Sequence, residues 1–304
     1  MKVKTKDLLT LNELSKNELL GLVNESIKLK KDLKKGICKP LLKNKTLAMI
    51  FQKPSTRTRV SFETGVFQLG GYALNLSADD LQLKRGETIE DTAKTLSRYV
   101  DMIMARVYSH DELEILAKNS TVPVINGLSD SFHPCQILAD LMTIKEKKKK
   151  LEGLKIAWIG DGNNVCNSLI YGCAKTSIDI SIATPKGYEP NSAVVKESKK
   201  LVDVQLLNDP VLAVKNADVV VTDTFVSIHH QVTDRTKDFL PKFQVNSNLM
   251  KKANHDAIFL HCLPAKRGQE VTSDVIDGPQ SVIWDEAENR LHAQKALMAS
   301  LLRV

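Results

Sequence analysis

Short runs of apolar residues recur along this chain, and longer segments with apolar residues at helical spacing separate them. Strands that are buried on both faces have this appearance, so the alternation predicts βα units and mostly parallel sheets. The predicted strands cover residues 46–51, 102–107 and 122–125 in the first half, and 155–159, 178–183, 218–222 and 258–260 in the second half. The expected fold class is therefore α/β, with sheets flanked by helices.

The length of 304 residues allows about two domains, each large enough to bury its own core. A run of lysines at 147–150 comes directly before the strand that opens the second half, which places the boundary near residues 135–150. The final segment, 287–301, has Ala and Leu at helical spacing and predicts one long helix. The pattern leaves open on which half this helix packs.

The composition, with 42% hydrophobic and 26% charged residues, is that of an ordinary folded protein. The formal net charge of +7 suggests a polyanionic partner, but the lysines cluster at 28–35 and 145–150 with few aromatic residues nearby for base stacking. We interpret both clusters as solvated helix faces and expect no nucleic-acid partner. No apolar run reaches the roughly 18 residues that span a bilayer, so no membrane partner is expected.

The five cysteines are widely spaced without a C-x-x-C pair, which favours a reducing compartment. The histidines show no H-E-x-x-H spacing, so we expect no metal site. The N-terminal residues 1–11 contain Asp7 and lack an apolar core, and they therefore do not predict a secretory signal.

Polar side chains follow nearly every predicted strand. In open α/β sheets, ligands bind beyond the carboxyl ends of the strands, so these side chains predict a binding cleft. They fall at 53–59, Arg106 and 133–136 in the first half, and at 160–164, Asp223 and 261–264 in the second half.

The segment Ser55-Thr-Arg-Thr-Arg59 precedes a predicted helix with Phe62, Val66 and Leu69 on one face. Unpaired N–H groups at a helix N-terminus bind phosphate, and the hydroxyls and the planar Arg57 guanidinium add further donors. The alternative interpretation is an ordinary Ser N-cap with surface arginines. The segment is not a P-loop, because the G-x-x-x-x-G-K-[ST] pattern is missing, and this disfavours nucleotide binding.

The turn Gly160-Asp-Gly-Asn-Asn164 begins like a dinucleotide fingerprint, but Val165 stands where the third glycine belongs. A tight βα turn is the competing interpretation, with the amides of Asn163 and Asn164 either capping the helix or holding a polar ligand.

Three further side chains are ambiguous when each is taken alone. His133 precedes a helix and is either a proton or hydrogen-bond donor or a structural histidine. Asp223 is either a helix cap or an acceptor for an ammonium group. Cys262 follows His261 directly, and adjacent residues on a strand point to opposite faces, so a nucleophile pair is disfavoured.

Taken together, four motifs closely resemble the carbamoyltransferase family in order and spacing over almost the whole chain. They are Ser55-Thr-Arg-Thr-Arg59, the arginine of Met104-Ala-Arg-Val-Tyr108, His133-Pro-Cys-Gln136 and His261-Cys-Leu-Pro264. The ornithine-using branch is the most similar. The aspartate-using branch typically has His-Pro-Leu-Pro in the last motif and lacks the Asp-x-x-x-Ser element that begins here at Asp223.

The resemblance implies two α/β domains. Residues 1–138, joined by the C-terminal helix 287–304, are expected to bind carbamoyl phosphate, and residues 139–286 are expected to bind L-ornithine. The implied reaction transfers the carbamoyl group to the δ-amine of ornithine, giving L-citrulline and phosphate, without a metal or cofactor. The implied assembly is a cytoplasmic homotrimer or a multiple of trimers, with active sites between subunits.

The resemblance also implies the site residues. Those for carbamoyl phosphate are Ser55, Thr56, Arg57, Thr58, Gln82, Arg106, His133, Gln136, Cys262, Leu263 and Arg290, with Gln82 reaching in from a neighbouring subunit. Four of them, Arg106, His133, Gln136 and Cys262, are implied to be catalytic. Those for ornithine are Asn164, Asp223, Ser227 and Ile228. The family usually continues Ser-Met-Gly, whereas this chain has Ser227-Ile-His229, and the loss of the glycine changes the flexibility expected of this loop.

Two rival hypotheses remain. A related transferase could use putrescine or aspartate, although Asp223 favours an α-ammonium group and no additional arginine-rich element matches a second carboxylate. A non-catalytic protein that binds carbamoyl phosphate or nucleic acid would not need His133, Gln136 and Cys262 together.

Overall fold

The computed structural model describes residues 2–77, 81–226 and 235–302. The chain divides into two compact units: residues 1–142 with 288–304 form unit 1, and residues 143–287 form unit 2. Two helices, α5 (Pro134–Lys148) and α12 (Ile283–Leu301), each continue from one unit into the other. Among the described helices, none has both the length and the apolar character that a membrane crossing requires.

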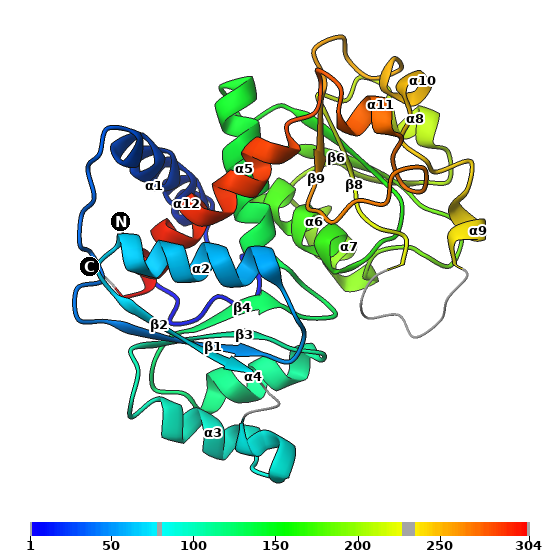
Figure 1. Ribbon diagram of the computed structural model, residues 1–304. Coiled ribbons are helices and arrows are strands. Elements are labelled where there is room, and N and C mark those ends of the chain that lie inside the picture. The colour runs from blue at the N-terminus through cyan, green and yellow to red at the C-terminus, as the bar shows by residue number, and fades with distance from the viewer. Residues whose placement is uncertain (1, 78–80, 227–234, 303–304) are drawn as a thin grey trace. The chain divides into compact units, whose positions relative to one another are not determined.

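Unit 1 contains a four-stranded parallel sheet with the order β2-β1-β3-β4. Figure 1 shows α2 and α12 over one face of this sheet and α3 and α4 over the other. The elements are η1 (Leu11–Glu13), α1 (Lys16–Lys34), β1 (Thr46–Phe51), α2 (Thr56–Gln68), β2 (Tyr72–Ser77), η3 (Gln82–Arg85), α3 (Ile89–Leu96), β3 (Met102–Arg106), α4 (His110–Asn119) and β4 (Val124–Leu128), followed by α5 and, at the end of the chain, α12.

Each face of this sheet has its own apolar packing, because side chains alternate along a strand. Ala48 and Ile50 of β1 and Ile103 of β3 pack with the buried residues of α3 and α4. On the α2 side, Gly65 of α2 allows close approach of α12, since a Cβ there would lie 3.2 Å from Cγ of Lys295. The C-terminal helix therefore packs on unit 1, as expected.

Unit 2 contains a five-stranded parallel sheet with the order β7-β6-β5-β8-β9. Ala157 and Ile159 of β5 and Phe259 of β9 face one apolar core, which α8, α10 and α11 also line. The elements are β5 (Lys155–Ile159), α6 (Asn164–Thr176), β6 (Asp179–Ala183), α7 (Ser192–Ser198), β7 (Val204–Leu207), α8 (Pro210–Val214), β8 (Val219–Thr222), α9 (Thr236–Phe239), α10 (Ser247–Met250), β9 (Ile258–His261) and α11 (Ser273–Ile276).

The predicted α/β class with parallel sheets is confirmed, and each predicted strand corresponds to an observed one within a few residues at its ends. The sequence pattern missed β2 and β7. Both lie at the edge of their sheets, and neither is fully buried along its length. Exposed positions interrupt the apolar run in β2 and β7, whereas the other two edge strands, β4 and β9, are buried along nearly their whole length and match predicted strands.

Candidate active site

The predicted phosphate loop of unit 1 lies at the carboxyl end of β1, where the chain enters α2. Ser55 is the N-cap of α2, and its Oγ accepts a hydrogen bond from Thr58 N at 3.4 Å. Thr58 is buried, whereas Arg57 is half-buried and Thr56 is exposed. The first turn of α2 contains no acidic residue, so the partial positive charge of this helix end is not offset locally. The Ser N-cap interpretation and an anion site are therefore compatible.

Two further cations, Lys53 and Arg106, lie at the carboxyl ends of β1 and β3. Arg106 is the last residue of β3 and is 8% exposed, and its carbonyl accepts from Gln52 N at 2.9 Å. Lys53 is also buried, and its Nζ lies 4.0 Å from the centre of the Tyr108 ring. Burial, and then the positive charge of Arg106, lower the pKa of Lys53. Two buried positive charges repel each other, and a bound anion would offset this repulsion.

Lys53 follows a predicted strand but is not among the predicted site residues. It lines a cavity of about 570 Å³ together with Ser55 and Thr56 of the phosphate loop and Asn75 and Ser77 of β2. The signal in the sequence was its position directly before the motif.

A turn before α5 presents His133 and Gln136. Ser129 N donates to Phe132 O at 3.0 Å, and Asn126 Nδ2 donates to the same carbonyl at 3.3 Å, which closes the turn. His133 and Gln136 are both buried. Gln136 Nε2 donates to Asp140 Oδ1 at 2.8 Å, one helical turn further along α5.

The structure brings Arg290 of α12 to these residues. Its Nη1 donates to Gln136 Oε1 at 2.8 Å, and its Nη2 donates to Thr58 Oγ1 at 3.4 Å. Arg290 is only 3% exposed. Three residues that are far apart in the sequence thus form one buried polar cluster in unit 1.

Gln82, the remaining predicted residue of unit 1, begins the 3₁₀ helix η3 and has an exposed side chain. It differs in this respect from Thr58, Gln136 and Arg290. Its predicted contribution to a neighbouring subunit stays a prediction.

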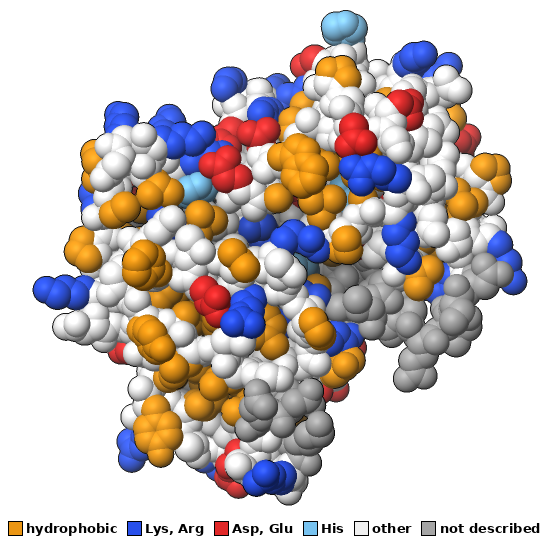
Figure 2. All heavy atoms as spheres, viewed as in Figure 1, with side chains coloured by type: hydrophobic (Ala, Val, Ile, Leu, Met, Phe, Trp, Pro, Cys, Tyr) orange, Lys and Arg blue, Asp and Glu red, His pale blue; other side chains and the backbone are white. Residues whose placement is uncertain are grey.

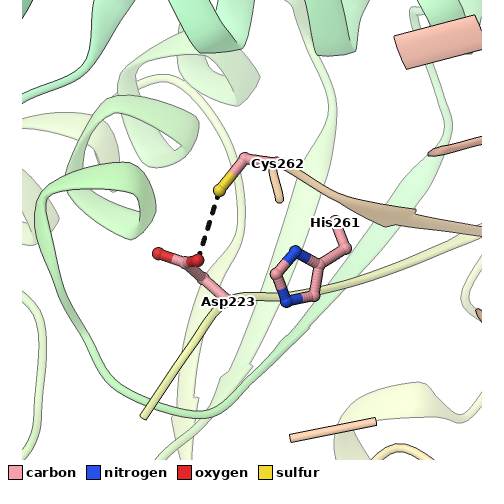
Figure 3. Close-up of side chains that lie close together, drawn as sticks. All are labelled: Asp223, His261 and Cys262. Carbon is pink, nitrogen blue, oxygen red and sulfur yellow. Dashed lines mark hydrogen bonds between the residues drawn. The ribbon is translucent and has the colours of Figure 1, made fainter. Parts of the chain in front are cut away.

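The corresponding polar cluster of unit 2 centres on Asp223, directly after β8. Figure 3 shows the Cys262 thiol pointing toward this carboxylate, and Sγ donates to Oδ1 at 3.2 Å. Asn163 Nδ2 donates to the other carboxylate oxygen, Oδ2, at 2.8 Å. Asp223 is 7% exposed, so both bonds help to hold a buried negative charge.

Asn163 has a second function as the N-cap of α6. Its Oδ1 accepts from Val165 N and Cys166 N at 3.0 and 3.1 Å. The predicted ornithine residue Asn164 follows as the first residue of α6 and is buried. The sequence is compatible with either helix capping or ligand binding for both amides. The structure shows that Asn163 caps the helix, and its amide nitrogen also orients Asp223.

His261 is bonded to residues other than Cys262. Leu263 N donates to His261 Nδ1 at 2.9 Å, so this nitrogen carries the lone pair, and the proton lies on Nε2, which contacts Glu270 Oε1 at 3.2 Å. Asp223, His261 and Cys262 have potential metal-ligand atoms within 4.8 Å of one another. Because both ring nitrogens of His261 are engaged, the geometry favours a hydrogen-bonded group over a metal site.

This arrangement also holds Leu263, whose φ is 59°, in the left-handed region. Leucine adopts that conformation at a cost of about 1 kcal/mol or more. The bond from Leu263 N to His261 offsets part of the cost and fixes the chain directly after Cys262. Glu270 is a residue of this group that the sequence reasoning missed, because it lies eight positions after Cys262 without a recognisable motif.

Asp161, in the turn after β5, is a second buried carboxylate of unit 2. Its Oδ2 accepts from Arg235 Nη2 at 3.2 Å, and the Arg235 guanidinium lies 4.7 Å from the centre of the Tyr188 ring. Burial raises the pKa of Asp161 to about 6, against the opposing charge of Arg235. The next residue, Gly162, has to be glycine, since a Cβ there would lie 2.2 Å from Pro190 N. Chain packing thus explains the second glycine of the Gly-x-Gly pattern.

Ser227 and Ile228, the other predicted ornithine residues, lie outside the described residues. The structure otherwise brings Thr58, Gln136 and Arg290 together in unit 1, and Asp223 and Cys262 together in unit 2.

Comparison with known proteins identifies the family to which both units are similar. The carbamoyl-P binding domain of the aspartate/ornithine carbamoyltransferases matches residues 6–146, and the Asp/Orn binding domain of the same family matches residues 152–301. The ornithine carbamoyltransferase of Cenarchaeum symbiosum is 61% identical over 99% of both chains. The solved ornithine carbamoyltransferase from Pyrococcus furiosus superposes with a TM-score of 0.93 at 55% identity, covering 96% of both chains. The solved anabolic enzyme from Campylobacter jejuni gives 0.91 at 44% identity, covering 99% of both.

Proposed function

The chain belongs to the aspartate/ornithine carbamoyltransferase family, and we propose that it transfers the carbamoyl group of carbamoyl phosphate to the δ-amine of L-ornithine, releasing L-citrulline and phosphate. The observation that carries the proposal is the buried cluster of Thr58, Gln136 and Arg290 beside the N-terminus of α2. A doubly charged acyl phosphate is the kind of ligand for which such donors are suited.

We assign carbamoyl phosphate to unit 1. The N–H groups of the first turn of α2, the hydroxyls of Ser55, Thr56 and Thr58, and the Arg57 guanidinium bind the phosphate oxygens. Arg106, His133 and Thr58 donate to the carbamoyl oxygen, on which negative charge grows during the reaction. Donors aimed at such an oxygen contribute roughly 3 kcal/mol each in comparable sites. Gln136 orients the carbamoyl nitrogen.

We assign ornithine to unit 2. The Asp223 carboxylate accepts hydrogen bonds from the α-ammonium group, and Asn164 binds the α-carboxylate, with Ser227 and Ile228 completing the site. Cys262 and Leu263 line the path of the ornithine side chain. Asp223 suits a cation in particular because the carboxylate is buried and is held at both oxygens by Asn163 and Cys262.

In the reaction, the lone pair of the neutral δ-amine attacks the carbamoyl carbon, and a new C–N bond forms. The bond between that carbon and the phosphate oxygen then breaks, phosphate leaves with the electron pair, and the departing phosphate takes up the proton that the nitrogen gives up. The cations around the phosphate stabilise this leaving group. Only the neutral amine has a lone pair, and the pKa of a free amine of this kind is about 10.4.

The pH profile tests this chemistry. We expect kcat/KM for ornithine to rise from about pH 6 to about pH 9, by up to about tenfold per pH unit, because the neutral fraction of the amine rises by that factor. A flat profile over this range would contradict attack by the free amine.

A comparison of acceptors separates this function from its rivals. Purified protein is incubated with carbamoyl phosphate and with ornithine, aspartate or putrescine in turn, and phosphate release and the carbamoylated product are measured. We expect turnover with ornithine, since Asp223 and Asn164 match its α-ammonium and α-carboxylate groups. Turnover with putrescine or aspartate instead would reassign the acceptor, and turnover with none would leave a binding protein.

We further propose a homotrimer, or a multiple of trimers, in which Gln82 of one subunit completes the site of the next. Unit 1 exposes several large apolar side chains, among them Val60 and Phe67, two turns apart on α2, and Tyr72 at the start of β2. Figure 2 shows apolar side chains on the face that carries these elements. Exposed apolar side chains beside an edge strand are typical of a surface that contacts a second copy of the chain. Light scattering after size exclusion tests the state, and Phe67→Glu is expected to give smaller species.

We also propose a cytoplasmic location. The five cysteines are free thiols, and Cys135, Cys166 and Cys173 are buried. Free thiols are typical of proteins in a reducing compartment. Fractionation of cells that express the tagged chain tests the location.

A further inference from the structure

The helix α12 carries polar side chains where it packs on α2. Arg290 and Gln294 are four residues apart and are 3% and 0% exposed. This spacing places the two side chains one above the other on the helix. A hydrogen-bonding group of a buried amide destabilises the fold when it is left unsatisfied, so the buried amide of Gln294 is expected to have partners at both ends.

The amide of Gln294 is satisfied at both ends in one orientation. Its Oε1 then accepts from Arg290 Nη2 at 3.0 Å and from Nε at 3.3 Å, and its Nε2 donates to Ser61 Oγ at 2.7 Å and to Arg290 O at 3.3 Å. Ser61 Oγ in turn donates to Thr58 O at 3.2 Å. The amide thus connects the edge of the guanidinium to the first turns of α2, which follow the phosphate loop.

Gln136 and Thr58 contact the same guanidinium. Arg290 Nη1 donates to Gln136 Oε1, and Nη2 donates to Thr58 Oγ1. Gln136 is held by Asp140 on α5. Acceptors on three helices therefore hold the guanidinium of Arg290 in its plane. Of the three acceptors Gln136, Thr58 and Gln294, only Gln294 accepts a hydrogen bond from the Nε–H group.

We propose that Gln294, held by Ser61, is a positioning residue that fixes the orientation of Arg290 for carbamoyl phosphate. The inference rests on the proposed function, in which Arg290 takes part in the carbamoyl phosphate site. A free arginine side chain samples many rotamers. An arginine that is already fixed loses less of this freedom when the ligand binds, so pre-orientation raises affinity.

The test replaces Gln294 by Met, which has a similar length but no hydrogen-bonding amide. Lys295→Met is the matched control, because Lys295 is buried and its Nζ donates to Gln68 Oε1 at 2.8 Å, which makes another polar bond, part-buried, between α12 and α2. Steady-state kinetics give KM for carbamoyl phosphate and for ornithine, and thermal unfolding gives the loss of stability of each variant.

We expect Gln294→Met to raise KM for carbamoyl phosphate by about 5- to 10-fold and to change KM for ornithine by less than about twofold. Lys295→Met is expected to lower the melting temperature comparably and to leave KM for carbamoyl phosphate within about twofold. Gln294→Glu keeps an acceptor for the guanidinium and is expected to recover most of the affinity. Ser61→Ala removes only the support of the amide and is expected to raise KM by about 2- to 3-fold.

Equal KM values for Gln294→Met and wild type, or equal changes in Gln294→Met and Lys295→Met, would overturn the inference. If Gln294→Met does not fold, the Ser61→Ala result decides in the same way. Arg290→Ala separates the inference from its premise. If the wild type turns over and KM for carbamoyl phosphate is raised in Arg290→Ala but not in the Gln294 and Ser61 variants, only the positioning function of Gln294 is rejected. If the wild type shows no turnover, the proposed function itself is rejected.

Discussion

The two units hold opposite charges by different structural means. In unit 1 a cation, Arg290, is fixed by acceptors on three helices, and two of these acceptors, Gln136 and Gln294, are themselves held by a further bond. In unit 2 an anion, Asp223, follows a strand directly and is held by a helix cap and by a thiol. The comparison indicates that a long side chain needs a network of helices to be fixed, whereas a short carboxylate at a strand end needs only its adjacent turns.

The largest effect is expected from Arg57→Ala in unit 1. Loss of a cation that binds phosphate should lower kcat/KM for carbamoyl phosphate by about 1,000-fold, because the substrate is held mainly by charge-assisted bonds. The exposed Arg98→Ala in the same unit is the control and is expected to act like wild type. A loss confined to ornithine would reverse the assignment of substrates to the two units.

Asp223→Asn tests unit 2. The amide keeps the shape but removes the charge that binds the α-ammonium group, and kcat/KM for ornithine should fall by about 100-fold while KM for carbamoyl phosphate stays nearly constant. Asp209→Asn, in an exposed helix cap where Asn serves equally well, is the matched control. Unchanged use of ornithine by Asp223→Asn would remove this carboxylate from the amino-acid site.

The pH dependence of the unfolding free energy tests the second buried carboxylate, Asp161. Its pKa is raised from 3.8 to about 6 in the folded protein, so between these values the native state keeps a proton that the unfolded chain has released. The stability gained from this proton is present at low pH and is lost as the pH rises through about 6. Asp161→Asn lacks this loss, so its unfolding free energy relative to wild type should increase by about 2 kcal/mol from about pH 4.5 to about pH 7.

Urea unfolding at several pH values measures that difference. A constant or decreasing difference would show that burial does not disfavour the ionised carboxylate, and that the bond to Arg235 dominates instead.

The smallest effects separate helix capping from orientation of the site. Asn163→Ser keeps an N-cap for α6 and should change stability by less than about 0.5 kcal/mol, but it removes the amide donor to Asp223 and should raise KM for ornithine by about 3- to 10-fold. Ser55→Ala in unit 1 should lower stability by about 1 kcal/mol through loss of its cap. If Asn163→Ser leaves KM for ornithine unchanged, Asp223 is oriented by Cys262 alone.

The strands with unbroken apolar runs could be predicted from the sequence, and so could the loops that follow them. Runs of β-branched and other apolar residues identify strands that are buried on both faces. Because such strands pair in parallel, their carboxyl ends lie along the same edge of the sheet. The edge strands β2 and β7 could not be found in this way, because their exposed positions break the apolar pattern. The phosphate motif was recognisable because its residues are contiguous.

The residues that support the site depend on tertiary structure. Gln294 lies among the apolar residues of α12, and only packing against α2 brings its amide to Arg290 and Ser61. Asn163 and Asn164 are chemically identical and adjacent, and only the direction of the turn after β5 places the first one on Asp223. The proton of His261 is fixed by Leu263 and Glu270, which come to it from two sides.

By itself, then, the sequence determined the fold class, the phosphate-binding motif and the resemblance to a family, since these depend on local periodicity and on contiguous residues. Tertiary structure decided which polar side chains share hydrogen bonds, and with them the orientation of Arg290, the carboxylate of Asp223 and the tautomer of His261. The physical reason is that a hydrogen bond depends on distances of a few tenths of an ångström and on angles. The positions of residues along a chain do not specify such distances until the helices and sheets have packed.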